Sequence, residues 1–203
     1  MKIWKRYIPY LSSGSWHIHT NLTDGKNNIL EYCEEAIKRK IPLLAFTEHV
    51  RKELNYDFDN FLEEIEIARD KFPELIILSG CETKVLSDGS LDIDNNLIKK
   101  IEYRIFAYHT FPKDRKLYLI TLKKVIRNKY ICTWAHPGLF LKSNAFEIKK
   151  EELVEIFKLM KKNNVLLEKN KKYNLPPESW ITEAKKLGVL LVRGNDAHSK
   201  YEL

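Results

Sequence analysis

The sequence has few cysteines and no long apolar segment, and these absences exclude several classes of protein. Its three cysteines, Cys33, Cys81 and Cys132, match neither a disulfide framework nor a thiolate metal site in number or spacing. No stretch approaches the ~18 consecutive apolar residues of a membrane span. The basic N-terminus is not followed by the apolar segment of a secretory signal. We therefore expect a reduced, cytoplasmic protein with no membrane partner.

The composition predicts a single globular domain with an excess of positive charge. The chain has 203 residues, 44% of them hydrophobic, which is enough for one sizeable core. Residues 1–14 are basic and aromatic and are predicted to form an N-terminal arm, and residues 15–203 the domain itself. The formal net charge of +7 favours anionic partners, either phosphorylated small molecules or nucleic acid. The lysines occur mainly as scattered pairs, which a solvated helical surface explains better than a dedicated binding patch. The oligomeric state stays open.

Short apolar runs alternate with amphipathic segments, which is typical of parallel βαβ units. About seven such units predict a closed or nearly closed α/β barrel, with a doubly wound open sheet as the alternative. The predicted strands are Ser15–His19, Leu43–Thr47, Leu75–Cys81, Tyr103–Tyr108, Ile131–Ala135, Val165–Leu167 and Val189–Arg193. The predicted helices are Asn28–Arg39, Phe61–Lys71, Leu97–Glu102, Lys116–Asn128, Glu147–Lys162 and Pro177–Leu187.

All six histidines lie at or just after the end of a predicted strand. In α/β barrels the active residues come from the C-terminal ends of several strands. One histidine at such a place is usually an ordinary polar residue, but six of six favour a shared site. Three carboxylates lie at comparable positions, and imidazole with carboxylate is a ligand set for Zn, Mn or Fe. The predicted ligands of two to three divalent ions are His17, His19, Asp24, His49, Glu82, His109, His136, Asp196 and His198.

These motifs together resemble the polymerase and histidinol phosphatase (PHP) family. The resemblance covers about residues 15 to 200 and rests on six segments: His17-Ile18-His19-Thr20 with Asp24-Gly25, Thr47-Glu48-His49, Gly80-Cys81-Glu82, His109, Ala135-His136-Pro137-Gly138 and Gly194-Asn195-Asp196-Ala197-His198. It implies a distorted (β/α)7 TIM-like barrel with a trinuclear metal site at the C-terminal ends of the strands. Active members of the family are metal-dependent phosphoesterases or nucleases.

The resemblance also implies how the ligands are shared. His17, His19, Glu82 and Asp196 would hold the first ion, and Glu82 would bridge to a second ion that His109 and His136 hold. The third ion would take Asp24, His49 and His198. Catalysis would involve Glu82, Asp196 and His198. Many relatives have histidine where this chain has Asp24, a departure that bears on metal preference.

Residues around the expected ligands are predicted to support them or to bind substrate. Arg51, Lys84 and Arg193 are predicted to contact phosphate, although each could instead be a surface residue. Glu168 and Asn170 fall at the end of a predicted strand and could orient the metal-binding histidines. Relatives generally continue into another helix after the last motif, whereas this sequence ends at Leu203. The N-terminal arm or a partner is expected to cover that side of the barrel, unless it is open.

The resemblance leaves three functions open. The leading one is hydrolysis of phosphomonoesters, as in histidinol phosphatases, by a metal-activated hydroxide. The second is a nuclease or nucleotide phosphoesterase that acts on DNA or RNA ends, which the positive charge favours. The third is a non-catalytic metal-binding module, whose mark would be missing ligands.

Overall fold

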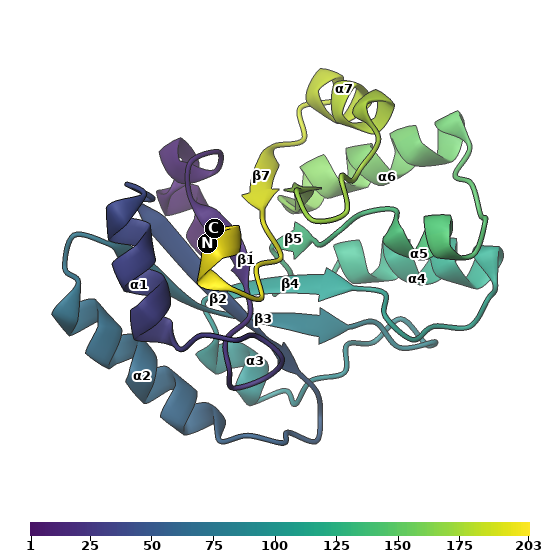
Figure 1. The fold of residues 1–203 in the computed structure, drawn as a ribbon. Coiled ribbons are helices and arrows are strands. Elements are labelled where there is room, and N and C mark those ends of the chain that lie inside the picture. The colour runs from purple at the N-terminus through teal and green to yellow at the C-terminus, as the bar shows by residue number, and fades with distance from the viewer.

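Seven parallel strands pair in chain order in the computed structural model, which describes residues 1–203 (Figure 1). Backbone hydrogen bonds link the two edges, from His19 N to Ala197 O (2.9 Å) and from Ala197 N to His17 O (3.0 Å). The sheet is thus a nearly closed barrel rather than a doubly wound open sheet, as the sequence predicts. The strands are β1 (Ser15–Ile18), β2 (Leu43–Val50), β3 (Ile76–Lys84), β4 (Tyr103–Ala107), β5 (Thr133–Trp134), β6 (Leu166–Asn170) and β7 (Leu191–Gly194).

Helices connect successive strands and cover the outside of the barrel (Figure 1). Their bounds differ from the sequence prediction by up to three residues; the helix predicted to begin at Glu147, for example, begins at Lys150. The helix predicted to begin at Phe61 begins at Phe58, because the carboxylate of Asp57 caps the free N–H groups of Asp59 and Asn60. A five-residue helix after Gly138 was not predicted. The helices are α1 (Ile29–Lys38), α2 (Phe58–Lys71), α3 (Leu97–Lys100), α4 (Arg115–Ile126), α5 (Leu139–Ser143), α6 (Lys150–Asn163) and α7 (Glu178–Lys186).

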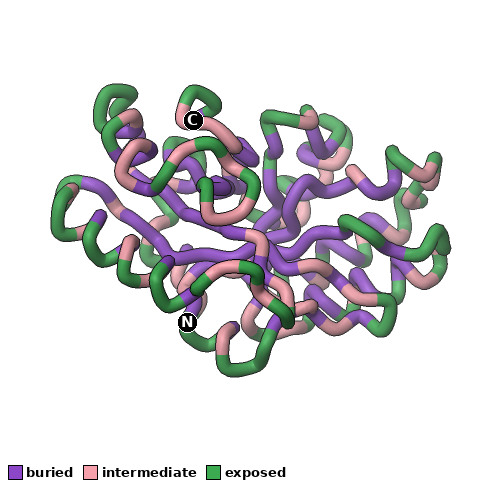
Figure 2. Tube along the Cα trace, turned by 60° about the horizontal axis from the view of Figure 1, so that its bottom comes forward, coloured by how far each residue is buried: buried purple, intermediate pink, exposed green.

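Apolar side chains fill both the space between strands and helices and the lower interior of the barrel. The interior cluster includes Leu43, Leu78 and Val192, which alternate along their strands with residues that face the helices. Buried segments accordingly run through the centre of the molecule in Figure 2, with exposed loops around them. Because the interior is packed at the N-terminal ends of the strands, the space for polar side chains is at their C-terminal ends.

The N-terminal arm completes this interior cluster. It consists of two 3-10 turns, η1 (Ile3–Arg6) and η2 (Ile8–Tyr10). Trp4 and Leu11 are buried against the interior residues, and Leu11 O accepts a hydrogen bond from Arg193 N in β7 (2.8 Å). The arm thus covers the N-terminal end of the barrel and leaves the other end to the polar residues. None of the helices combines the length and apolar character needed to cross a membrane.

Candidate metal centre

The buried carboxylate of Glu82 lies at the centre of the nine predicted ligands. It projects from β3 into the mouth of the barrel, where five imidazoles surround it, including that of His19, whose Nε2 lies 3.7 Å from Glu82 Oε2. Its Oε1 lies 2.8 Å from His136 Nε2 and 3.7 Å from His17 Nε2. Its Oε2 lies 3.0 Å from His49 Nδ1 and 3.3 Å from His109 Nε2. A carboxylate in this position has oxygens available to two neighbouring metal ions.

The two histidines of β1 extend this cluster toward the last motif. His17 and His19 lie on the same face of the strand, and their Nε2 atoms are 3.0 Å apart. Asp196 Oδ1 lies 3.7 Å from His17 Nε2 and 3.6 Å from His19 Nε2. With Glu82, these residues form the set that the family resemblance assigns to one ion.

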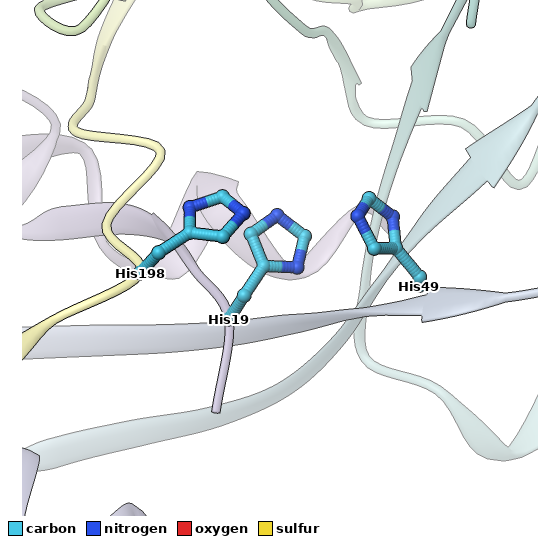
Figure 3. Close-up of side chains that lie close together, drawn as sticks. All are labelled: His19, His49 and His198. Carbon is cyan, nitrogen blue, oxygen red and sulfur yellow. The ribbon is translucent and has the colours of Figure 1, made fainter. Parts of the chain in front are cut away.

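Asp24 forms a second, more exposed part of the cluster. Its Oδ2 lies 3.3 Å from His49 Nε2 and 3.2 Å from His198 Nε2. Figure 3 shows the rings of His19, His49 and His198 gathered from three separate segments. One nitrogen from each of these three rings lies within 4.8 Å of the other two. All nine predicted ligands therefore meet at one end of the barrel.

The geometry and chemistry of this cluster fit metal ions. Ligand atoms about 2.0–2.2 Å from one ion lie roughly 3–4 Å apart, which is the spacing found here. His19 Nδ1 is buried without a hydrogen-bond partner, and the nearest carboxylate oxygen, on Asp24, is 3.9 Å away. An unpaired buried nitrogen costs free energy unless something binds it. The cluster thus has the donors of a divalent-metal site, and contains no thiolate.

Glu168, on β6, holds the first histidine in place. Its Oε1 is 2.6 Å from His17 Nδ1, a contact that orients His17 Nε2 toward the other predicted ligands. Its Oε2 accepts hydrogen bonds from the amide of Asn170 (3.1 Å) and the backbone N of His136. Gly194 makes room for this carboxylate, since a Cβ there would lie 1.8 Å from Glu168 Oε1. The supporting role expected of Glu168 and Asn170 thus agrees with their contacts.

Burial and neighbouring charges shift the pKa values of adjacent residues of the cluster in opposite directions. Burial alone would lower the pKa of His17, but the carboxylates of Glu168, Asp196 and Glu82 outweigh it and raise this pKa well above its usual range. Burial and the neighbouring His17 lower the pKa of His19, so its imidazole is neutral and able to bind metal. Burial would raise the pKa of Glu82, yet the surrounding imidazoles hold it far below its ordinary value. The Glu82 carboxylate is therefore ionised.

The backbone at two of the ligands is in the left-handed region. His136 has φ 28° and Asp196 has φ 51°. A residue with a side chain adopts positive φ at a cost, and such residues cluster at functional sites. Here the conformation aims both side chains at the cluster.

The three predicted phosphate contacts differ in where they lie. Lys84 lies two residues beyond Glu82 on the same face of β3, and its ammonium makes no hydrogen bond within the chain. The guanidinium of Arg51 donates to the backbone oxygens of Val50 (2.7 Å) and Glu82 (3.2 Å), beside the site.

Arg193, by contrast, is not brought to the cluster. It alternates on β7 with inward-facing Val192 and Gly194, so its side chain points out of the barrel toward Ser13 O (3.5 Å). Lys172 is the cation that sequence reasoning missed. Its Nζ lies 3.1 Å from His198 Nδ1 and 3.7 Å from Asp196 Oδ2. Its place in the Lys171-Lys172 pair made it resemble a surface residue, and only the turn after β6 brings it to the site.

Comparisons with known proteins point to one family. The model of the PHP domain family matches residues 15–172. The DNA polymerase/3'-5' exonuclease PolX of Bacillus subtilis (strain 168) is 29% identical over 198 residues, which cover 92% of this chain and 34% of PolX. The chain thus spans about a third of that relative. A protein of Caldicellulosiruptor bescii named "Probable phosphatase" is 26% identical over 200 residues, 92% of this chain and 80% of that protein.

A solved structure has the same fold. The crystal structure of a Listeria monocytogenes protein, described as a candidate histidinol phosphatase, hisK, superposes with a TM-score of 0.72. The match covers 93% of this chain and 96% of that chain at 15% sequence identity. At this identity the likeness shows the barrel alone.

Proposed function

This chain belongs to the PHP domain family, and we propose that it is a metal-dependent phosphoesterase whose substrates are phosphomonoesters. The observation that carries the proposal is the convergence of nine imidazole and carboxylate ligands around Glu82. The family includes phosphate-ester hydrolases, and a relative named as a phosphatase covers most of this chain. A non-catalytic module is disfavoured because no predicted ligand is missing.

We assign the nine residues to two or three divalent ions, Zn, Mn or Fe, as the family resemblance implies. When bound, such ions would supply a water of lowered pKa and neutralise phosphate oxygens. Glu82 contributes an ionised carboxylate that two ions can share, and His17 is oriented for binding by Glu168. Asp196 and His198 lie next to each other, with His198 Nδ1 3.5 Å from Asp196 Oδ1, where they can orient a water or a leaving group.

Cations at the rim are proposed to bind the phosphate. Lys172 is adjacent to Asp196 and His198, and Lys84 extends from β3 with a free ammonium. Positive charges fixed near the reacting phosphoryl group stabilise the charge that its oxygens carry in the transition state. Arg51 is engaged with two backbone oxygens, so we assign it chiefly to positioning the strand end that carries Glu82.

Hydrolysis of p-nitrophenyl phosphate by the metal-loaded protein tests the proposal. We expect activity in the wild type and its loss in His17→Ala. Because all six histidines lie in the site, the control is that circular dichroism of His17→Ala matches that of the wild type. A wild type that binds metal but is inactive on a broad set of phosphomonoesters would contradict the proposal.

A nuclease is the second candidate, because the similarity to PolX covers 92% of this chain and the net charge is +7. Trp4 weighs against it. This aromatic residue of the arm is only 4% exposed, so it cannot serve as a stacking platform for bases. Shortening of a 3'-labelled or 5'-labelled oligonucleotide, without activity on monoesters, would favour this candidate.

A further inference from the structure

A cavity lies on the outside of the barrel, between the N-terminal arm, strands β6 and β7, and helix α7. Its volume is about 610 Å³, within the range of small-molecule sites. In Figure 1 the purple arm and the yellow-green β7 lie beside each other, with α7 beyond them. None of the nine proposed metal ligands lines this cavity. It is therefore distinct from the metal cluster, although Asn170, whose amide donates to Glu168, also lines this cavity.

Positive charge is concentrated around this cavity without compensation. Lys169, Lys171, Lys185 and Arg193 line it, and no aspartate or glutamate does. None of these four cations is in an ion pair, whereas other cations of the chain, such as Lys123 with a glutamate of α6, are paired. Several unpaired cations around one concave surface attract an anion that carries more than one charge.

Arg193 distinguishes this cavity from an ordinary lysine-rich surface. Burial and the nearby charge of Arg39 lower the pKa of the half-buried Arg193 guanidinium. Its one side-chain hydrogen bond is long, 3.5 Å to Ser13 O. A half-buried guanidinium without a carboxylate partner is unfavourable by itself, and a bound phosphate would pair with it in two-point geometry.

The wall of the cavity is apolar where the charges are absent. Its exposed apolar surface is that of Leu191, which is partly exposed, because the other apolar lining residues, Leu11, Ile181 and Val192, are themselves almost fully buried. An inorganic anion would leave this surface uncovered. A ligand with a flat apolar or aromatic body would bury it and gain roughly 25 cal/mol for each Å² removed from water.

We propose that this cavity binds an organic phosphate with at least two negative charges and a ring-shaped apolar body, of which a nucleoside diphosphate is the representative. The phosphates contact Arg193 and the surrounding lysines, and the ring covers the apolar wall. The proposal does not depend on the hydrolytic function of the metal centre.

Calorimetric titration of the full chain with ADP tests the proposal. The protein is first stripped of metal with a chelator, which is then removed, so that phosphate binding through metal ions does not contribute. We expect one ADP per chain, at least tenfold weaker binding in Arg193→Gln and in Lys185→Gln, and weaker binding of inorganic pyrophosphate than of ADP. Circular dichroism of each variant establishes that it is folded.

Two matched variants control for general loss of charge. Lys186→Gln removes the same charge from the same helix next to Lys185, and Arg127→Gln removes a guanidinium from a different basic surface. Both should bind ADP as the wild type does. Absence of ADP binding, equal weakening in the control variants, or pyrophosphate binding as tight as that of ADP would overturn the proposal.

Discussion

At the scale of single residues, the proposed site depends on a carboxylate outside the nine predicted ligands. Glu168 orients His17 through a 2.6 Å contact. We expect Glu168→Gln to weaken metal binding by about 10- to 100-fold while the protein stays folded, since supporting partners typically have effects of that size. Competition with a chromogenic chelator measures the affinity. The matched control is Glu178→Gln in the first turn of α7, and an unchanged affinity in Glu168→Gln would show that its contact with His17 is dispensable.

Gly194 provides a second prediction at this scale. Because a Cβ would overlap Glu168 Oε1, Gly194→Ala should displace that carboxylate, cost about 1–3 kcal/mol of unfolding free energy and weaken metal binding. Urea unfolding and chelator competition measure the two effects. If both substitutions act through Glu168, adding Gly194→Ala to Glu168→Gln should weaken metal binding by less than the product of the two single effects. Independent effects would contradict this account.

The sequence predicts these residues unevenly. The nine ligands follow from strand ends, and their convergence agrees with that prediction. Side chains alternate between the two faces of a strand, and Arg193 lies between the inward-facing Val192 and Gly194, so it points outward. Lys172 could not be found in this way, because it lies in an irregular turn whose course depends on tertiary contacts rather than on local pattern.

At the scale of elements, a side-chain cap fixes where α1 begins. Asn28 begins α1 with a capping box, in which its side chain accepts from Glu31 N. Asn96 precedes α3 and makes no side-chain cap. We expect Asn28→Ala to lower the unfolding free energy by about 1 kcal/mol and Asn96→Ala to have almost no effect. Denaturant unfolding of both variants measures this, and equal costs would refute the role of the cap.

Element boundaries show the limits of local pattern. Apolar periodicity predicts which segments are strands and which are helices. It does not predict where the strands end: β2 extends to Val50 and β3 to Lys84, beyond their predicted ends at Thr47 and Cys81. The extra residues are predicted polar ligands and their neighbours. They remain extended because the neighbouring strand pairs with them, His49 with Glu82 and Lys84 with Ala107. Such pairing is a tertiary effect that periodicity does not contain.

At the scale of the whole molecule, the proposed metal centre joins segments from both ends of the chain. Its ligands range from His17 in β1 to His198 after β7. Metal ions that bind only the folded state stabilise it by mass action, by about 3–4 kcal/mol when their concentration is several hundred times the Kd. We therefore expect chelation to lower the Tm by roughly 5–15 °C, and added Mn²⁺ or Zn²⁺ to restore it. A Tm that chelator leaves unchanged would argue against bound metal.

The central claim is that this cluster binds metal ions and hydrolyses phosphate esters with them. The most direct measurement is titration of metal-free protein with Mn²⁺ or Zn²⁺, with bound metal and hydrolysis of p-nitrophenyl phosphate recorded in the same samples. Our account predicts that activity rises as two to three ions bind per chain and then saturates, and that His17→Ala neither fills the site nor becomes active. Folded wild-type protein that binds no metal, or activity that does not depend on the metal bound, would contradict it.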